Sequence, residues 1–151
     1  MLPDTKIDDL NSFLDVLPSK IREHLLQNNN LQSLIEVILD LGRKPQFRFF
    51  DRDEEVDLDI ITFDELDELT ERIGSFGNDN RAGVEKTLHR FSAIRARDRT
   101  VIGVTCRVGR SIQGTTKAIT DLVNEDKSML LLGKPGVGKT TILRELARVL
   151  S

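Results

Sequence analysis

The sequence predicts an α/β protein: a mixed α+β domain over residues 1–110, followed by the incomplete start of a P-loop nucleotide-binding domain. Three observations carry this prediction. Apolar residues change between helical and strand spacing along the first domain. A glycine-rich loop at 133–140 stands between an apolar run and a helical pattern. With 38% apolar and 31% charged residues, the 151-residue chain also has the composition of a folded domain.

Residues 8–27 are predicted to form two short helices. Pro18 suits the first turn of the second helix, because proline has no N–H and a helix start leaves that group unpaired. Ile21, Leu25 and Leu26 fall on one side of this helix. That side is therefore expected to face the core.

Two segments alternate apolar and polar residues around a turn, which is typical of β-hairpins. Their turns lie at 42–45 and 98–100. The apolar residues of the alternating arms are Ile35, Val37, Leu39, Leu41, Phe47 and Phe49 in the first hairpin, and Ile102, Val104, Cys106 and Val108 in the second. These side chains are expected on the buried face of a sheet.

Between the hairpins, an acidic connection at 51–59 is interpreted as a solvated surface rather than a metal site. Thr62 and Glu65 then form a capping box, the pattern that satisfies free N–H groups at a helix start. The apolar residues at helical spacing that follow are Phe63, Leu66, Leu69 and Ile73. Gly74 is expected to end this helix, and a polar loop leads from it to residue 83.

The boundary between the two domains is expected near residue 111. Residues 111–127 are predicted to be a linker and a short helix, and 128–151 the first strand, P-loop and helix of a truncated P-loop NTPase domain. The strand is expected at 128–132. Because such a domain needs further parallel strands, the chain is expected to be the front of a longer protein.

The loop predicts a site for ATP and Mg²⁺. Its glycines let backbone N–H groups turn toward a phosphate, and the following helix adds its positive N-terminus. Lys139 is expected to reach the β- and γ-phosphates, the Thr140 hydroxyl to bind the magnesium ion, and Lys134 to lie at the rim. The candidate cofactor-binding residues are Gly133, Lys134, Pro135, Gly136, Val137, Gly138, Lys139, Thr140 and Thr141. The competing interpretation is a tight strand-to-helix turn that binds nothing.

Hydrolysis is a separate prediction from binding, because a P-loop only cradles phosphates. The acid that holds magnesium and the residue that orients water are expected after Ser151, so no catalytic residue is assigned. ATPase activity is expected of a longer protein and not of this chain alone. A small nucleotide kinase fits less well, because such enzymes place the loop near the N-terminus.

Charge is divided unevenly along the chain. Residues 1–80 carry 8 Lys and Arg against 19 Asp and Glu, and residues 81–151 carry 14 against 6. The clustered arginines of the basic half are Arg90, Arg95, Arg97, Arg99, Arg107 and Arg110. They could pair with the acidic half, compensate the charge of a nucleotide, or face nucleic acid. The alternative function is therefore a non-catalytic nucleic-acid or protein interaction module. Phe91 is the one aromatic residue among these arginines, which gives base stacking little support.

Cys106 is the sole cysteine, which excludes an intrachain disulfide, and its apolar neighbours favour a buried structural thiol. The acidic N-terminus has no apolar segment of the kind a signal peptide needs. No apolar run approaches the length of a membrane span, so no membrane-spanning segment is predicted.

The motifs "LDLGRKP" at 39–45 and "GVTCRVGR" at 103–110, together with the P-loop, carry a resemblance to a known family. The chain resembles the N-terminal part of the hypothetical chloroplast open reading frame 45 family of algal plastids and cyanobacteria. That family is similar to the stage III sporulation protein AA and to ring-forming secretion ATPases. The resemblance extends over almost the whole chain.

The resemblance implies a RecA-like core after the α+β domain, assembly into a hexamer, and a further C-terminal module that binds single-stranded nucleic acid. It also implies a location in the plastid stroma or the bacterial cytoplasm. By motif match it assigns ATP and magnesium binding to the P-loop. Arg107 and Arg110 carry over as phosphate-facing or interdomain positions.

Overall fold

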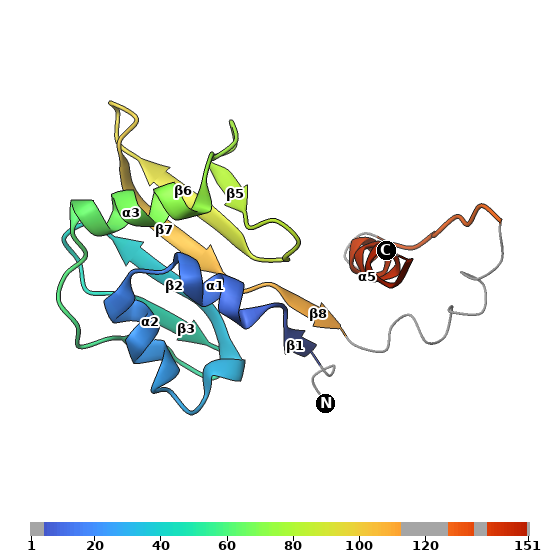
Figure 1. Ribbon diagram of the computed structural model, residues 1–151, viewed down its shortest axis with the longest axis horizontal. Coiled ribbons are helices and arrows are strands. Elements are labelled where there is room, and N and C mark those ends of the chain that lie inside the picture. The colour runs from blue at the N-terminus through green and yellow to red at the C-terminus, as the bar shows by residue number, and fades with distance from the viewer. Residues whose placement is uncertain (1–4, 113–126, 135–138, 151) are drawn as a thin grey trace. The chain divides into compact units, whose positions relative to one another are not determined.

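Six antiparallel strands form the main sheet, in the order β4-β3-β2-β7-β6-β5 (Figure 1). The computed structural model describes residues 5–112, 127–134 and 139–150. The strands of the sheet are β2 (Leu34–Asp40), β3 (Gln46–Phe49), β4 (Asp53–Glu55), β5 (Arg81–Gly83), β6 (Arg90–Arg95) and β7 (Val101–Arg107). The sheet belongs to the first of two compact units, Ile7–Arg110, and the second unit comprises Met1–Lys6 and Ser111–Ser151.

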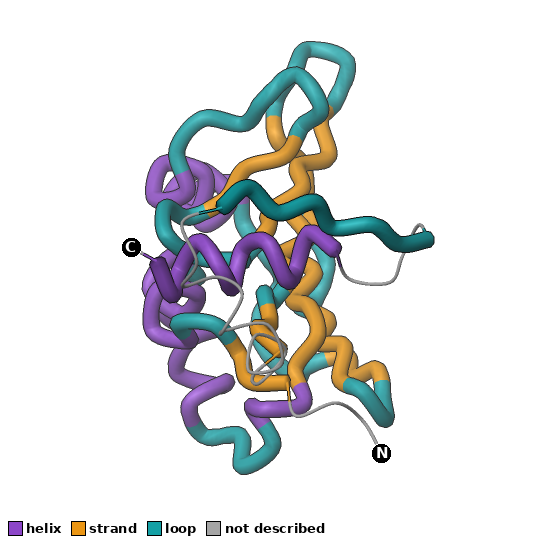
Figure 2. Tube along the Cα trace, turned by 90° about the vertical axis from the view of Figure 1, so that its right-hand side faces the viewer, coloured by secondary structure: helices purple, strands orange, loops and turns teal. Residues whose placement is uncertain are grey.

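Three α-helices of the first unit cover one face of this sheet, so strands and helices form two layers (Figure 2). They are α1 (Leu10–Val16), α2 (Ser19–Leu26) and α3 (Phe63–Ile73), and the short 3₁₀ helix η1 (Leu31–Ser33) precedes β2. The capping box is confirmed: the Thr62 side chain accepts from the Glu65 N–H, and the Glu65 carboxylate accepts from the Thr62 N–H. Gly74 ends α3 with a φ of 90°, a conformation that favours glycine.

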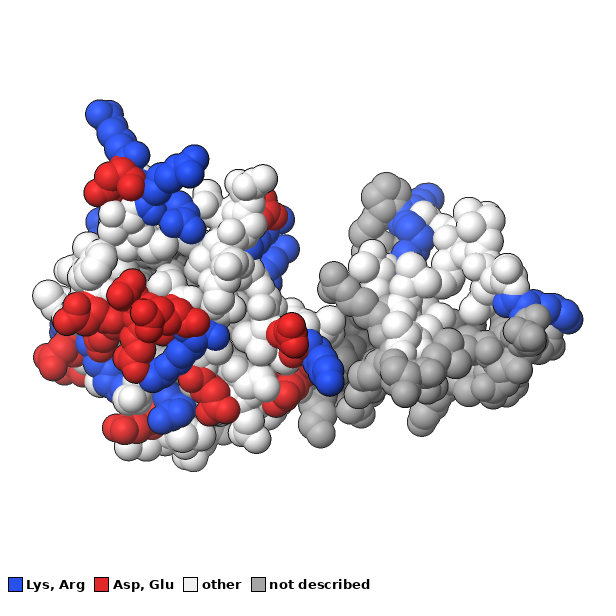
Figure 3. Space-filling view, turned by 45° about the horizontal axis from the view of Figure 1, so that its top comes forward, with Lys and Arg blue, Asp and Glu red and all other residues white. Residues whose placement is uncertain are grey.

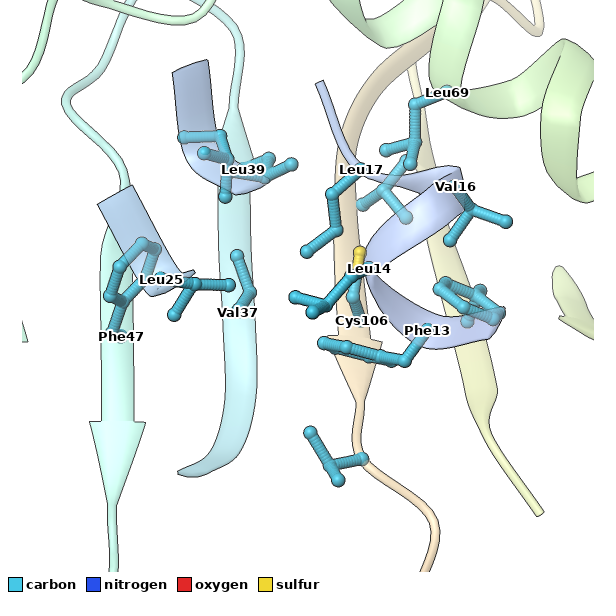
Figure 4. Close-up of a cluster of buried hydrophobic side chains, with 14 of the residues drawn as sticks. Phe13, Leu14, Val16, Leu17, Leu25, Val37, Leu39, Phe47, Leu69 and Cys106 are labelled. Carbon is cyan, nitrogen blue, oxygen red and sulfur yellow. The ribbon is translucent and has the colours of Figure 1, made fainter. Parts of the chain in front are cut away.

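The core lies between the helices and the sheet, where side chains from both layers meet (Figure 4). Both hairpins are confirmed as antiparallel pairs, β2 with β3 and β6 with β7, and β2 also pairs with β7. The largest fully buried side chains are Phe13, Phe47, Phe91, Leu17, Ile21, Leu25, Leu34, Leu39, Ile61, Leu66, Leu69 and Val37. Each such side chain contributes roughly 1.5–3 kcal/mol by leaving water.

A bulge in β2 changes which of its residues face the core. The pairing of β2 with β3 shifts between Leu34 and Glu36. Leu34 is therefore buried, whereas Ile35, expected in the core, is half-buried. An extra residue in one strand reverses the alternation on either side of it, and the amino-acid pattern alone carried no sign of this one.

Several expected core residues lie at the surface. Leu26 of α2 is 62% exposed and Phe63 of α3 is 49% exposed, because the stripe of each helix that meets the sheet is narrower than the apolar pattern suggested. Leu41 is also exposed, and Ile102 is half-buried. The acidic connection contains the edge strand β4, and the polar loop contains the edge strand β5.

A second sheet pairs the two short strands β1 (Thr5–Ile7) and β8 (Arg110–Ile112). The short helix predicted within 111–127 lies outside the described residues. The helix predicted after the P-loop is α5 (Lys139–Leu150). Among the helices that the structure describes, none combines the length and the apolar character needed to cross a membrane.

Candidate nucleotide-binding site

The described part of the P-loop consists of Gly133 and Lys134 before the turn and α5 after it. Pro135, Gly136, Val137 and Gly138 lie outside the described residues. The helix begins at Lys139, so its free N–H groups and the positive end of its dipole stand at the end of the glycine loop. A helix N-terminus in this setting suits a phosphate group.

Lys139 connects the two ends of the loop. Its ammonium group donates to the carbonyl oxygens of Gly133 at 2.6 Å and Lys134 at 2.7 Å. An ammonium has three N–H donors, so these two bonds leave one donor available. The ammonium group of the lysine is thereby held beside the backbone of Gly133 and Lys134.

Thr140 is exposed in the first turn of α5, so its hydroxyl is accessible to solvent. Thr141 belongs to the same helix, and its side chain is outside the described residues. On another side of the helix, Leu146 is buried and Ile142 is half-buried. The spacing of these two residues gives α5 an apolar side.

The apolar run before the loop does not form the predicted strand. Residues 128–134 have no regular secondary structure, and Leu130 and Leu132 are 80% and 83% exposed. A buried parallel strand needs a neighbour on each side to pair its backbone groups, and the described residues provide no pairing for this run. The assignment of 128–151 to a P-loop domain stays a prediction.

Arg107 lies on the face of the main sheet opposite the helices, where it pairs with Glu36. Its Nη2 lies 3.3 Å from the Glu36 Oε2, and Arg48 Nη1 lies 2.5 Å from the other carboxylate oxygen. Glu36 is only 4% exposed, although both guanidinium groups are about half exposed. Burial of this acid between two arginines was not expected from the sequence.

Arg110 is held by backbone carbonyls far away in the sequence. Its Nη2 donates to the carbonyl oxygens of Gln32 at 2.7 Å and Leu34 at 2.6 Å. Its guanidinium carbon also lies 4.6 Å from the centre of the Phe50 ring. Burial lowers the pKa of Arg110, which nevertheless stays protonated, as arginine does in proteins. The proposed phosphate-facing roles of Arg107 and Arg110 stay predictions.

A group of hydrogen bonds fixes the chain next to Arg110. Buried His89 accepts from the Gly109 N–H through Nδ1 at 2.9 Å, and its Nε2 lies 3.0 Å from the Asp9 carbonyl oxygen. The Asp8 carboxylate accepts from the Leu88 N–H at 2.8 Å. His89 is therefore a structural residue.

Two other expectations concern reactive or metal-binding groups. Cys106 is fully buried, and burial raises the pKa of its thiol, which disfavours the nucleophilic thiolate. Within the described part of the chain, no cluster of three or more His, Cys, Asp and Glu side chains is arranged to hold a metal ion. Acids of the acidic connection pair with the cations Lys44 and Arg48.

Comparison with curated proteins identifies relatives of the chain. The ycf45 protein of Porphyra purpurea is 52% identical over 95% of the chain and 26% of its own length. SEEDLING PLASTID DEVELOPMENT 1 of Arabidopsis thaliana is 45% identical over 95% of the chain and 21% of its own length. The ycf45 protein of Cyanidium caldarium is 39% identical over 95% of the chain and 43% of its own length. These homologues support the resemblance to the ycf45 family, and the chain spans less than half the length of each.

No protein-family model matches the chain. Among solved structures, the X-ray structure of the Legionella pneumophila ATPase DotB is similar, with a TM-score of 0.55 and 14% sequence identity. The similarity covers 89% of this chain and 43% of that one. At this identity the match concerns the fold alone, a mixed arrangement of helices and strands.

Proposed function

We propose that the chain is the N-terminal portion of a ring-type P-loop ATPase and that residues 133–141 bind ATP with Mg²⁺. The observation that carries the proposal is Lys139, which starts α5 and reaches back to the carbonyl oxygens of Gly133 and Lys134. This brings a lysine, a helix N-terminus and a glycine-rich loop together, the three features that cradle a triphosphate.

The third donor of the Lys139 ammonium would contact the β- and γ-phosphates of the nucleotide. The Thr140 hydroxyl would bind the magnesium ion, which neutralises part of the phosphate charge. Hydrogen bonds to charged groups are worth roughly 1.5–3 kcal/mol each, so loss of the lysine alone should reduce ATP affinity by about tenfold to a hundredfold or more. Hydrolysis is proposed for the whole protein, because it needs further groups to position water and hold the metal.

Two properties of the relatives extend the proposal. The name of the Arabidopsis relative refers to plastid development, which supports a plastid location for this protein. The likeness in fold to the ATPase DotB agrees with the proposed ATPase, and assembly of the whole protein into a ring is part of the proposal. Both statements concern the whole protein, of which the chain is expected to be one part.

The proposal is tested by calorimetric titration with ATP in the presence and absence of Mg²⁺. The titration is made on this chain and on a longer form of the protein that carries the residues following Ser151. We expect magnesium-dependent binding, strongest in the longer form, that Thr140→Ala weakens in magnesium but not in EDTA. Absence of binding in both forms would contradict the proposal.

A further inference from the structure

The face of the main sheet opposite α1, α2 and α3 is not covered by any helix described for the first unit (Figure 2). The register aligns one row of residues straight across four strands of this face: Arg48 on β3, Glu36 on β2, Arg107 on β7 and Arg90 on β6. Neighbouring strands are about 4.8 Å apart, so this arginine row is roughly 14 Å long.

The first part of the row is held rigidly by its buried acid. Glu36 accepts from Arg48 and Arg107 at the same time, and with 4% of its surface exposed it can hardly turn toward water. The side chains of the two arginines keep about half of their own surface, with exposures of 47% and 53%. Their outward N–H donors are therefore oriented in advance, which reduces the entropy lost when a ligand binds.

The second part of the row has an excess of positive charge. Arg90 lies directly opposite Arg107 in the antiparallel pair of β6 and β7, an arrangement of like charges that destabilises a sheet. Arg90 is exposed, and it makes no ion pair or side-chain hydrogen bond among the described residues. Arg81, opposite Ser92, adds a third positive charge on the same face. An anion lying across these positions would relieve the repulsion.

An aromatic ring lies at the end of the row. Phe50 follows β3 directly, two residues after Arg48 of the row, and its N–H donates to the Ser33 carbonyl oxygen just before the start of β2. The Arg110 guanidinium covers one side of the Phe50 ring, yet 49% of the residue stays exposed. The contact of Arg110 with Phe50 is not predictable from local patterns, because Phe50 belongs to the acidic half and lies 60 positions before Arg110.

We propose that this uncovered face binds single-stranded nucleic acid, with Arg90, Arg107 and Arg81 contacting phosphates and Phe50 stacking on a base. Guanidinium groups beside an exposed ring are the combination that single-strand binding surfaces use. The arginines could also bind an acidic protein segment, but such a segment would leave Phe50 without a role. The competing occupant is a second copy of the chain, which would bind through an acidic surface such as the one visible in Figure 3.

The test is fluorescence anisotropy of a labelled 15-nucleotide single-stranded oligonucleotide with the full chain, without ATP, from about 50 to 300 mM salt. Three phosphate contacts predict a slope of log K against log salt near −2, because each contact contributes about −0.7 on single strands. Arg90→Ala should make the slope shallower by about 0.7 and weaken binding about fivefold at 0.1 M salt. The matched control is Arg97→Ala, an exposed arginine at the tip of the β6–β7 hairpin.

Phe50→Ala provides an independent arm, with Phe63→Ala as its control, since both phenylalanines are 49% exposed. We expect at least about a fivefold loss for Phe50→Ala and no change for Phe63→Ala. Lys139→Ala should bind the oligonucleotide normally, which separates this proposal from that for the P-loop. Equal binding by each variant and its control would overturn the inference. The inference would also be overturned if the parent chain bound no oligonucleotide and light scattering showed that it forms dimers which Arg90→Ala does not form.

Discussion

The buried acid Glu36 allows a prediction that separates the loss of its arginine partners from the loss of its burial. Replacing both Arg48 and Arg107 with methionine removes their charges but retains side chains long enough to cover Glu36. Replacing both with alanine removes the charges and also opens Glu36 to water. If the Glu36 carboxylate is desolvated in the folded protein, the methionine double variant must lose more free energy of unfolding than the alanine double variant.

The magnitude follows from the structure. Glu36 is 4% exposed and both of its ion pairs are within 3.3 Å, so methionine variants would leave a covered charge without partners. Such a loss costs about 3–5 kcal/mol for a fully buried pair. Because the two arginines are half exposed, we expect the lower end, about 3 kcal/mol. The alanine pair should cost about 1–2 kcal/mol, since water replaces the lost partners.

The assay is urea unfolding followed by circular dichroism, because the chain has no Trp or Tyr to report by fluorescence. Glu36→Gln serves as the reference that removes the acid itself, and we expect it to cost about 1 kcal/mol. A methionine double variant that is no less stable than the alanine double variant would contradict the expected cost of the covered charge. That result would mean that Glu36 is effectively solvated despite its low exposure.

Three further predictions concern the first unit. In Gly109→Ala the new Cβ would lie 2.2 Å from the Leu88 carbonyl carbon, so we expect the free energy of unfolding in urea to fall by several kcal/mol. The control is Gly83→Ala, whose new Cβ would lie 3.3 Å from its nearest neighbour, and we expect only a small loss. Burial raises the pKa of Glu65, but the Thr62 N–H and Lys20 outweigh it and lower that pKa overall. The resulting stability is present above the unfolded pKa of about 4.3 and is lost as pH falls through the lower folded value. Glu65→Gln should therefore be less stable than the parent protein at pH 7 and nearly equal to it near pH 2, whereas exposed Glu71→Gln should differ little at either pH. Cys106 should react with a thiol reagent only at the rate of unfolding, and fast labelling of the folded protein would argue against its burial.

Local patterns predicted local structure well. The capping box of α3 and the two hairpins depend on residues a few positions apart, and the structure has each of them. Failures arose where a distant element decides the outcome. Phe63 fits the apolar spacing of α3, but it lies at the edge of the stripe that meets the sheet, so it is exposed. The bulge near Glu36 likewise depends on how β2 meets β3.

In the candidate site, too, contacts between residues close in the sequence were predictable and contacts between distant residues were not. The P-loop was recognisable because its residues are consecutive, and the contact of Lys139 with Gly133 spans only six positions. The arginines were recognisable as a cluster but not as individual contacts. Arg110 bonds to carbonyl groups 76 and 78 positions away, and Glu36 gains its two arginines from different strands. Such contacts depend on the register in which the strands pair, and the composition of the basic half does not determine that register.

Binding of a nucleotide by Lys139 can be tested by comparing two lysines of the same loop. Magnesium-ATP affinity is measured by calorimetry for Lys139→Ala and for Lys134→Ala, with the circular dichroism spectrum confirming that both variants are folded. The account predicts a loss of at least about tenfold for Lys139→Ala and a change of less than about threefold for the rim residue Lys134. Equal affinities of the two variants, or unchanged binding in Lys139→Ala, would contradict it.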